Sequence, residues 1–171
     1  PALSHGHPSA LHSAAVFSSL IHDLLPAGAT LQEAAAAAAE RAARSGVPEL
    51  AERLQAAVSL AAENRGSTAS VSPEQMKQAL GEGWVAEEAL AIGLYAALAA
   101  SNAGTPQEHF RRAVGLSVNH DGDSDSTASV TGNILGVLYG LEALPADWLS
   151  AIDARETVEA MADAFIGVTA G

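Results

Sequence analysis

Asn119-His120-Asp121-Gly122-Asp123-Ser124-Asp125-Ser126-Thr127 is an acidic loop, and it runs directly into Ala128-Ser129-Val130-Thr131-Gly132-Asn133-Ile134-Leu135-Gly136-Val137-Leu138-Tyr139-Gly140. Three aspartates alternate along the loop. Carboxylate oxygens in a short loop are the ligands that hard cations such as Mg²⁺ or Ca²⁺ take up. The first hypothesis from this stretch is therefore a divalent-metal site.

The spacing of the loop argues against a calcium-binding EF-hand. Such a loop has glycine at position 6 and a bidentate glutamate at position 12. Counted from Asp121, these positions hold Ser126 and Gly132. Two interpretations stay open: Asp123, Asp125 and Ser126 cap the following helix and favour its positive end, or a cation neutralises carboxylates that would otherwise repel one another.

Three glycines lie on one face of the helix predicted after the loop, at Gly132, Gly136 and Gly140. Each weakens a helix by about 1 kcal/mol relative to alanine. Three on one face predict that another backbone approaches closely there, and that this helix is central and buried.

Residues 119–140 also resemble the C-terminal signature of the ADP-ribosylglycohydrolase family, which includes dinitrogenase reductase-activating glycohydrolase and ADP-ribosylhydrolase-like proteins. That signature is a Gly-Asp-x-Asp-Thr core followed by a glycine-spaced helix. Two further segments fit the family in the same order, Ser4-His5-Gly6-His7-Pro8 and Leu80-Gly81-Glu82-Gly83-Trp84-Val85-Ala86-Glu87-Glu88-Ala89-Leu90. The resemblance covers nearly the whole chain, but only the C-terminal half to two-thirds of the family's domain.

The resemblance implies a mostly helical hydrolase that cleaves the glycosidic bond between ADP-ribose and a modified protein or other acceptor. It implies a pair of Mg²⁺ ions, with Mn²⁺ as a substitute. By motif position, the implied metal ligands are Asp123, Asp125 and Ser126, where Ser126 replaces the family's usual threonine. The implied contacts with the ADP-ribosyl substrate are His5, Gly83, Trp84, Asn119 and Gly122.

The resemblance also implies that part of the active site lies elsewhere. The family's N-terminal part supplies a second acidic ligand cluster and the catalytic acid, and these have no counterpart in this sequence. We therefore expect the chain to be the C-terminal part of such a domain, whose site is completed by an N-terminal segment. Two alternatives stay open: a catalytically inactive binding or structural domain, as in the crystallin relatives of the family, and a metal-stabilised scaffold with no substrate.

Composition predicts a single all-α domain over residues 1–171. Hydrophobic residues make up 49% of the chain and aromatic residues only 4%. Much of the apolar content is alanine, which is the best helix former. A net charge of −12 argues against binding to a nucleic-acid backbone, which requires basic side chains. No apolar run approaches the roughly 18 residues that span a bilayer. We expect a cytoplasmic protein that does not enter membranes.

Proline and capping signals predict where the helices begin and end. Helices are expected from Pro8 to a stop at Pro26–Gly28, from Thr30 to about Ser45, from Pro48 to a loop at 65–70, from Ser72 to Leu80, from Trp84 to about Ala100, and from Thr105 to the acidic loop. After the glycine-spaced helix, a turn at Leu141–Pro145 and two short helices are expected.

Several polar residues near these signals have a structural alternative. His5 can belong to a mobile tail, and Trp84 can be a core residue behind a helix end at Gly81. Glu87 and Glu88 lie in the first turn of a predicted helix, where acidic residues favour the dipole, so we assign them a structural role. No serine lies in a nucleophile-elbow pattern, which argues against serine-hydrolase chemistry.

Overall fold

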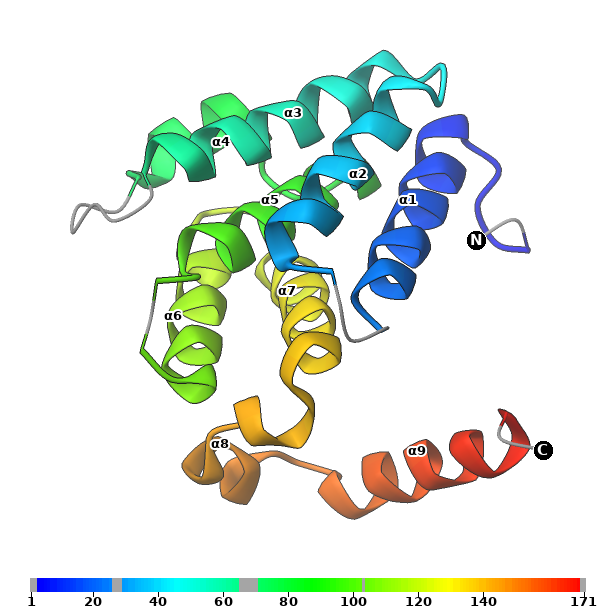
Figure 1. Ribbon diagram of the computed structural model, residues 1–171, viewed down its shortest axis with the longest axis vertical. Coiled ribbons are helices and arrows are strands. Elements are labelled where there is room, and N and C mark those ends of the chain that lie inside the picture. The colour runs from blue at the N-terminus through cyan, green and yellow to red at the C-terminus, as the bar shows by residue number, and fades with distance from the viewer. Residues whose placement is uncertain (1–2, 26–28, 65–70, 103, 170–171) are drawn as a thin grey trace.

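The computed structural model describes residues 3–25, 29–64, 71–102 and 104–169, and every regular element within them is a helix, which confirms the all-α prediction (Figure 1). The elements are α1 (Pro8–Leu24), α2 (Leu31–Ala43), α3 (Pro48–Glu63), α4 (Pro73–Leu80), α5 (Ala86–Ala99), α6 (Pro106–Val118), α7 (Ser124–Tyr139), the 3-10 helix η1 (Gly140–Ala143), α8 (Ala146–Ala151) and α9 (Arg155–Thr169). The predicted helix stop at 26–28 and the predicted loop at 65–70 lie outside the described residues.

The helix starts follow the capping signals of the sequence. At Thr30, Ser72 and Thr105, the side-chain hydroxyl accepts a hydrogen bond from the backbone N–H three residues later, and the side chain there bonds back to the cap. Pro8 and Pro48 occupy the first turns of α1 and α3, where a missing N–H costs nothing. These local signals place the starts of five helices correctly.

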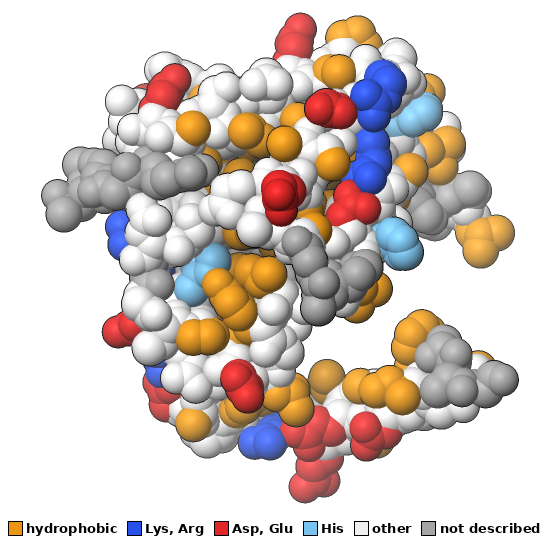
Figure 2. Space-filling model, in the orientation of Figure 1, with side chains coloured by type: hydrophobic (Ala, Val, Ile, Leu, Met, Phe, Trp, Pro, Cys, Tyr) orange, Lys and Arg blue, Asp and Glu red, His pale blue; other side chains and the backbone are white. Residues whose placement is uncertain are grey.

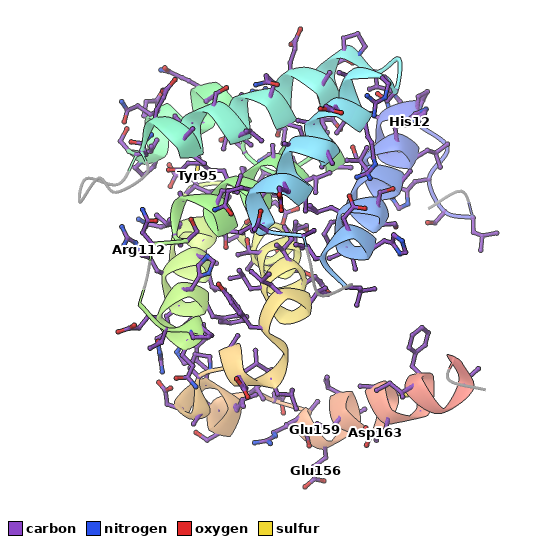
Figure 3. The ribbon with its side chains drawn as sticks, viewed as in Figure 1. His12, Tyr95, Arg112, Glu156, Glu159 and Asp163 are labelled. Carbon is purple, nitrogen blue, oxygen red and sulfur yellow. The ribbon has the colours of Figure 1, made fainter. Side chains whose placement is uncertain are left out.

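The core is built around α5, which is buried along nearly its whole length and packs against α1, α3, α6 and α7. Leu50 and Leu54 of α3 are fully buried in the same cluster. The backbones of α5 and α7 come close at Gly93, where a Cβ atom would lie 2.5 Å from Cγ1 of Val130. Tyr95 of α5, labelled in Figure 3, is buried here, and burial raises the pKa of its phenol.

The glycine face of α7 does not behave as predicted. A Cβ atom added at Gly132, Gly136 or Gly140 would have no heavy atom within 4 Å, apart from chain neighbours and the helix's own nearby backbone. The predicted close backbone approach at these glycines is therefore wrong, and the tight contact of α7 lies at Val130, opposite Gly93. Gly140 instead ends the helix with a φ of +67°.

Helix α9 stands apart from the other helices (Figure 1). It has 15 residues, longer than the short helix predicted. Its hydrophobic side chains, including Val158 and Met161, are exposed. Figure 2 shows them on the side toward α1, with acidic side chains on the opposite side, where Glu156 points away in Figure 3. Among the described residues, no helix combines the length and the hydrophobicity needed to cross a membrane.

Candidate active site

The three predicted metal ligands converge at the start of α7. Asp123 is the N-cap residue, and its carboxylate accepts a hydrogen bond from the backbone N–H of Ser126 at 3.4 Å. Two side-chain hydrogen bonds lower the pKa of Asp123. The bond with Asp125 has the larger effect, and the bond with Ser126 has the smaller one. The capping interpretation is therefore correct for Asp123. It does not exclude a metal, because Asp123 interacts with the side chains of both Asp125 and Ser126.

Two polar residues that the sequence analysis did not single out hold the acidic loop in shape. Nδ1 of His120 accepts a hydrogen bond from the backbone N–H of Gly122 at 3.0 Å, and Nε2 lies 3.2 Å from Oγ1 of Thr127. The Nε2–H tautomer satisfies both contacts. Thr127 is fully buried and donates to the carbonyl oxygen of Ser117 at 2.6 Å. The sequence feature that could have identified His120 is its position in a loop directly before a helix.

The segment Gly81–Trp84, between α4 and α5, packs directly on the acidic loop. The backbone N–H of Asp123 donates to the carbonyl oxygen of Glu82 at 2.8 Å. A Cβ atom at Gly122 would lie 1.8 Å from that oxygen, and one at Gly83 would lie 2.9 Å from Cγ2 of Thr127. Both glycines permit the contact between the two loops, while their predicted role as substrate contacts stays a prediction.

A pocket of about 410 Å³ brings together His5 and Trp84, two predicted substrate contacts that lie far apart in the sequence. Trp84 is 67% exposed, so its interpretation as a core residue is wrong. The pocket is also lined by His7, Ser9, Ala10, Val85, Ala86 and Glu87. The pocket therefore lies between the start of α5, directly after Gly83 in the sequence, and the first turn of α1.

Glu87 lies in the wall of this pocket and accepts a short hydrogen bond from the hydroxyl of Ser9. Sequence reasoning gave Glu87 a purely structural role, because its position in the first turn of α5 is explained by the helix dipole alone. Only the three-dimensional approach of α1 to α5 reveals the pocket position.

The remaining predicted contacts lie at the edges of these features. His5 is exposed, and its Nδ1 lies 2.9 Å from the hydroxyl oxygen of Ser4. His7 caps α1, since its side chain accepts a hydrogen bond from the backbone N–H of Ser9. Asn119 is exposed at the C-terminal end of α6. One backbone N–H group at the start of α1 is thus already bonded to His7.

The donors at the acidic loop suit Mg²⁺ in one of its usual binding modes. In the described part of the chain, no group of three or more histidine, aspartate or glutamate side chains is arranged to hold a metal. Mg²⁺ usually keeps several waters and binds through one or two carboxylates together with substrate oxygens. Asp123, Asp125 and Ser126 match that donor set, and they do not form an all-protein cage.

Comparison with known proteins places these features in a family. The family model described as ADP-ribosylglycohydrolase matches residues 2–171. An ADP-ribosylarginine hydrolase of Serratia proteamaculans (strain 568) is 36% identical over 56 residues, which cover 33% of this chain and 15% of that relative. No solved structure matches. The match, which spans nearly all of this chain, does not bear out the expectation that the chain is the C-terminal portion of the family's domain.

Proposed function

Because the chain belongs to the ADP-ribosylglycohydrolase family, we propose that it takes part in Mg²⁺-dependent hydrolysis of the glycosidic bond between ADP-ribose and a modified protein or other acceptor. The observation that supports this proposal best is the convergence of Asp123, Asp125 and Ser126. These side chains lie beside the loop Gly81–Trp84. Trp84 lines a pocket that also contains histidine and glutamate side chains.

The acidic loop would bind the cation through Asp123, Asp125 and Ser126. The low pKa of Asp123 keeps its carboxylate charged, as a ligand for a cation must be. When bound, Mg²⁺ would orient ribose hydroxyls and lower the pKa of a water molecule. Cleavage of a bond to ribose proceeds through an oxocarbenium-like transition state, which nearby carboxylates stabilise electrostatically.

The pocket residues would bind the ADP-ribosyl group. The exposed ring of Trp84 offers an apolar face to a sugar or a base. His5 and His7 offer ring N–H groups to phosphate oxygens, and Glu87 offers a carboxylate that accepts hydrogen bonds from hydroxyl groups. These groups would bind and orient the substrate rather than supply the catalytic acid.

Arginine is the acceptor that the comparison with the Serratia protein favours, because that relative is named as an ADP-ribosylarginine hydrolase. A second candidate function is binding of ADP-ribose without hydrolysis. It is favoured by a specific observation, namely that the carboxylates of the described residues do not assemble into a metal cluster of three or more groups.

Calorimetric titration with ADP-ribose, with and without Mg²⁺, tests the proposal together with an assay for release of ADP-ribose from an ADP-ribosylarginine peptide. The hydrolase proposal predicts binding that tightens with Mg²⁺ and release that requires it. Binding without release would favour the binding module. A chain that does not bind ADP-ribose at millimolar concentration would contradict both functions.

A further inference from the structure

Glu88 ties the segment before α5 to two other parts of the molecule. One of its carboxylate oxygens, Oε2, accepts hydrogen bonds from the backbone N–H groups of Glu82 and Gly83, each at 3.1 Å. The other, Oε1, lies 3.5 Å from a guanidinium nitrogen of Arg53 in α3. Arg53 in turn donates to the carbonyl oxygen of Ala79 at 2.9 Å. Glu88 is thus the junction between α3, the end of α4 and the loop that follows.

These contacts differ from those of an ordinary helix cap in the same chain. In the capping boxes of α2 and α6, the third helical residue, Glu33 or Glu108, accepts a hydrogen bond from the N–H of the cap residue itself. Glu88 is also the third residue of its helix, but the cap residue Val85 makes no side-chain cap bond. The partners of Glu88 lie two and three residues before that cap. Its carboxylate therefore holds the loop, beyond what capping α5 requires.

The surrounding glycines leave room for this arrangement. Gly81 has a φ of +92°, and a Cβ atom there would lie 2.2 Å from the carboxyl carbon of Glu88. On the other side of the loop, the carbonyl oxygen of Glu82 accepts the N–H of Asp123 at 2.8 Å, and Gly122 makes room for it. A continuous path of hydrogen bonds thus runs from Arg53 through Glu88 and Glu82 to Asp123.

We propose that Glu88 is a positioning residue for the candidate active site: it fixes the Gly81–Trp84 loop, whose Glu82 carbonyl sets the place of Asp123. This inference rests on the proposed function, in which Asp123 is a metal ligand. Glu88 does not touch the cation or the substrate, because its two oxygens are directed at the backbone of Glu82 and Gly83 and at Arg53. Partners that orient metal ligands from outside the coordination sphere commonly change metal affinity.

The test compares Glu88→Ala with Glu33→Ala in the 171-residue chain, because the carboxylate of Glu33 bonds to Thr30 at the start of α2. Two quantities are measured on folded protein: the affinity for Mn²⁺, and the hydrogen-exchange rate of the Asp123 amide. We expect Glu88→Ala to weaken Mn²⁺ binding by about 10- to 100-fold and to speed exchange at Asp123. Glu33→Ala should change neither, although it also removes a glutamate from the third position of a helix.

The outcomes separate this inference from the proposed function. If the unmodified chain does not bind Mn²⁺, the metal assignment fails, and the exchange rate at Asp123 alone decides the role of Glu88. If Glu88→Ala leaves both quantities unchanged, the positioning role is wrong. Should Glu88→Ala fail to fold, Glu88→Gln carries the same test, since it keeps an acceptor for the loop and loses the charge that pairs with Arg53. A smaller weakening is expected for it, and unchanged values would overturn the proposal.

Discussion

Gly122 shows how a single residue controls the contact between the two loops. Its position leaves no space for a side chain, because a Cβ atom would lie 1.8 Å from the carbonyl oxygen of Glu82 and 2.6 Å from its carbon. Backbone atoms cannot rotate away as the end of a flexible side chain can. A larger residue must therefore push the loops apart and break the bond between Asp123 and Glu82.

We predict that Gly122→Ala lowers the free energy of unfolding by about 1–3 kcal/mol, as measured by urea denaturation. The control is Gly115→Ala in α6, where nothing lies within 4 Å of the added Cβ. That variant should gain about 0.5–1 kcal/mol, because glycine is a poor residue within a helix. Equal effects of the two substitutions would show that the contact at Gly122 is not tight.

His109 gives the molecule a predictable response to pH. The side chain is buried, with Nε2 2.7 Å from the carbonyl oxygen of Ala97 and Nδ1 2.8 Å from the hydroxyl of Tyr139. Both contacts are satisfied when Nε2–H donates to Ala97 and Nδ1 accepts from Tyr139. Burial lowers the pKa of His109 below its ordinary value of 6.5, so the neutral ring is the form that fits the fold.

Because the folded-state pKa is depressed, the unfolded chain takes up this proton first as the pH falls. The contribution of His109 to stability is therefore complete above about pH 6.5 and is lost as the pH drops below that value. We predict that the free energy of unfolding, measured by denaturation at several pH values, falls more steeply below this pH in the unmodified chain than in His109→Gln. Identical slopes would contradict the assignment.

At the scale of single elements, local signals in the sequence predicted most of the helix starts. Thr30, Ser72 and Thr105 were expected as cap residues and are observed as such, because a capping box involves only four consecutive residues. The spacing of glycines along α7 carries no comparable information. It shows that side chains are absent from one face, and it does not show whether another backbone lies against that face.

Two glycine substitutions in α5 and α7 distinguish a glycine that faces a close neighbour from one that does not. A Cβ atom at Gly93 would lie 2.5 Å from Cγ1 of Val130 and 3.2 Å from the backbone nitrogen of Thr131, whereas one at Gly132 would meet nothing within 4 Å. We predict that Gly93→Ala costs about 1–3 kcal/mol of stability and that Gly132→Ala adds about 1 kcal/mol, both measured by urea denaturation. A destabilising Gly132→Ala would restore the original prediction of a close approach at that glycine.

The parts of the site that sequence reasoning missed depend on contacts between distant segments. The carbonyl oxygen of Glu82 meets the N–H of Asp123, and the hydroxyl of Ser9 meets the carboxylate of Glu87. The sequence does not show which distant residue either member of such a pair contacts. Asp123, Asp125 and Ser126, by contrast, lie within one turn of each other, so their convergence could be expected from spacing and family resemblance together.

At the scale of the whole molecule, stability is concentrated in the helices around α5. Leu54 of α3 is fully buried in this core, whereas Met161 of α9 is 67% exposed. Removing a buried leucine side chain leaves a cavity, while shortening an exposed side chain changes little. Helix α9 should therefore contribute little to the cooperative unfolding of the chain.

We predict that Leu54→Ala lowers the free energy of unfolding by about 2–5 kcal/mol, and that Met161→Ala changes it by no more than about 0.5 kcal/mol. Chemical denaturation followed by circular dichroism measures both. A loss of several kcal/mol in Met161→Ala would mean that α9 packs against an apolar surface in solution.

The most direct test of the account is the affinity of the acidic loop for Mg²⁺ or Mn²⁺ in Asp123→Asn and Asp125→Asn. Asp163→Asn serves as the control, since Asp163 is an exposed carboxylate on α9 (Figure 3). Asparagine keeps the shape of each side chain and removes its charge. We predict that either substitution in the loop weakens metal binding at least about tenfold, which corresponds to about 1.4 kcal/mol, while the control binds as the unmodified chain does. Metal binding that is unchanged in both loop variants would contradict the central claim.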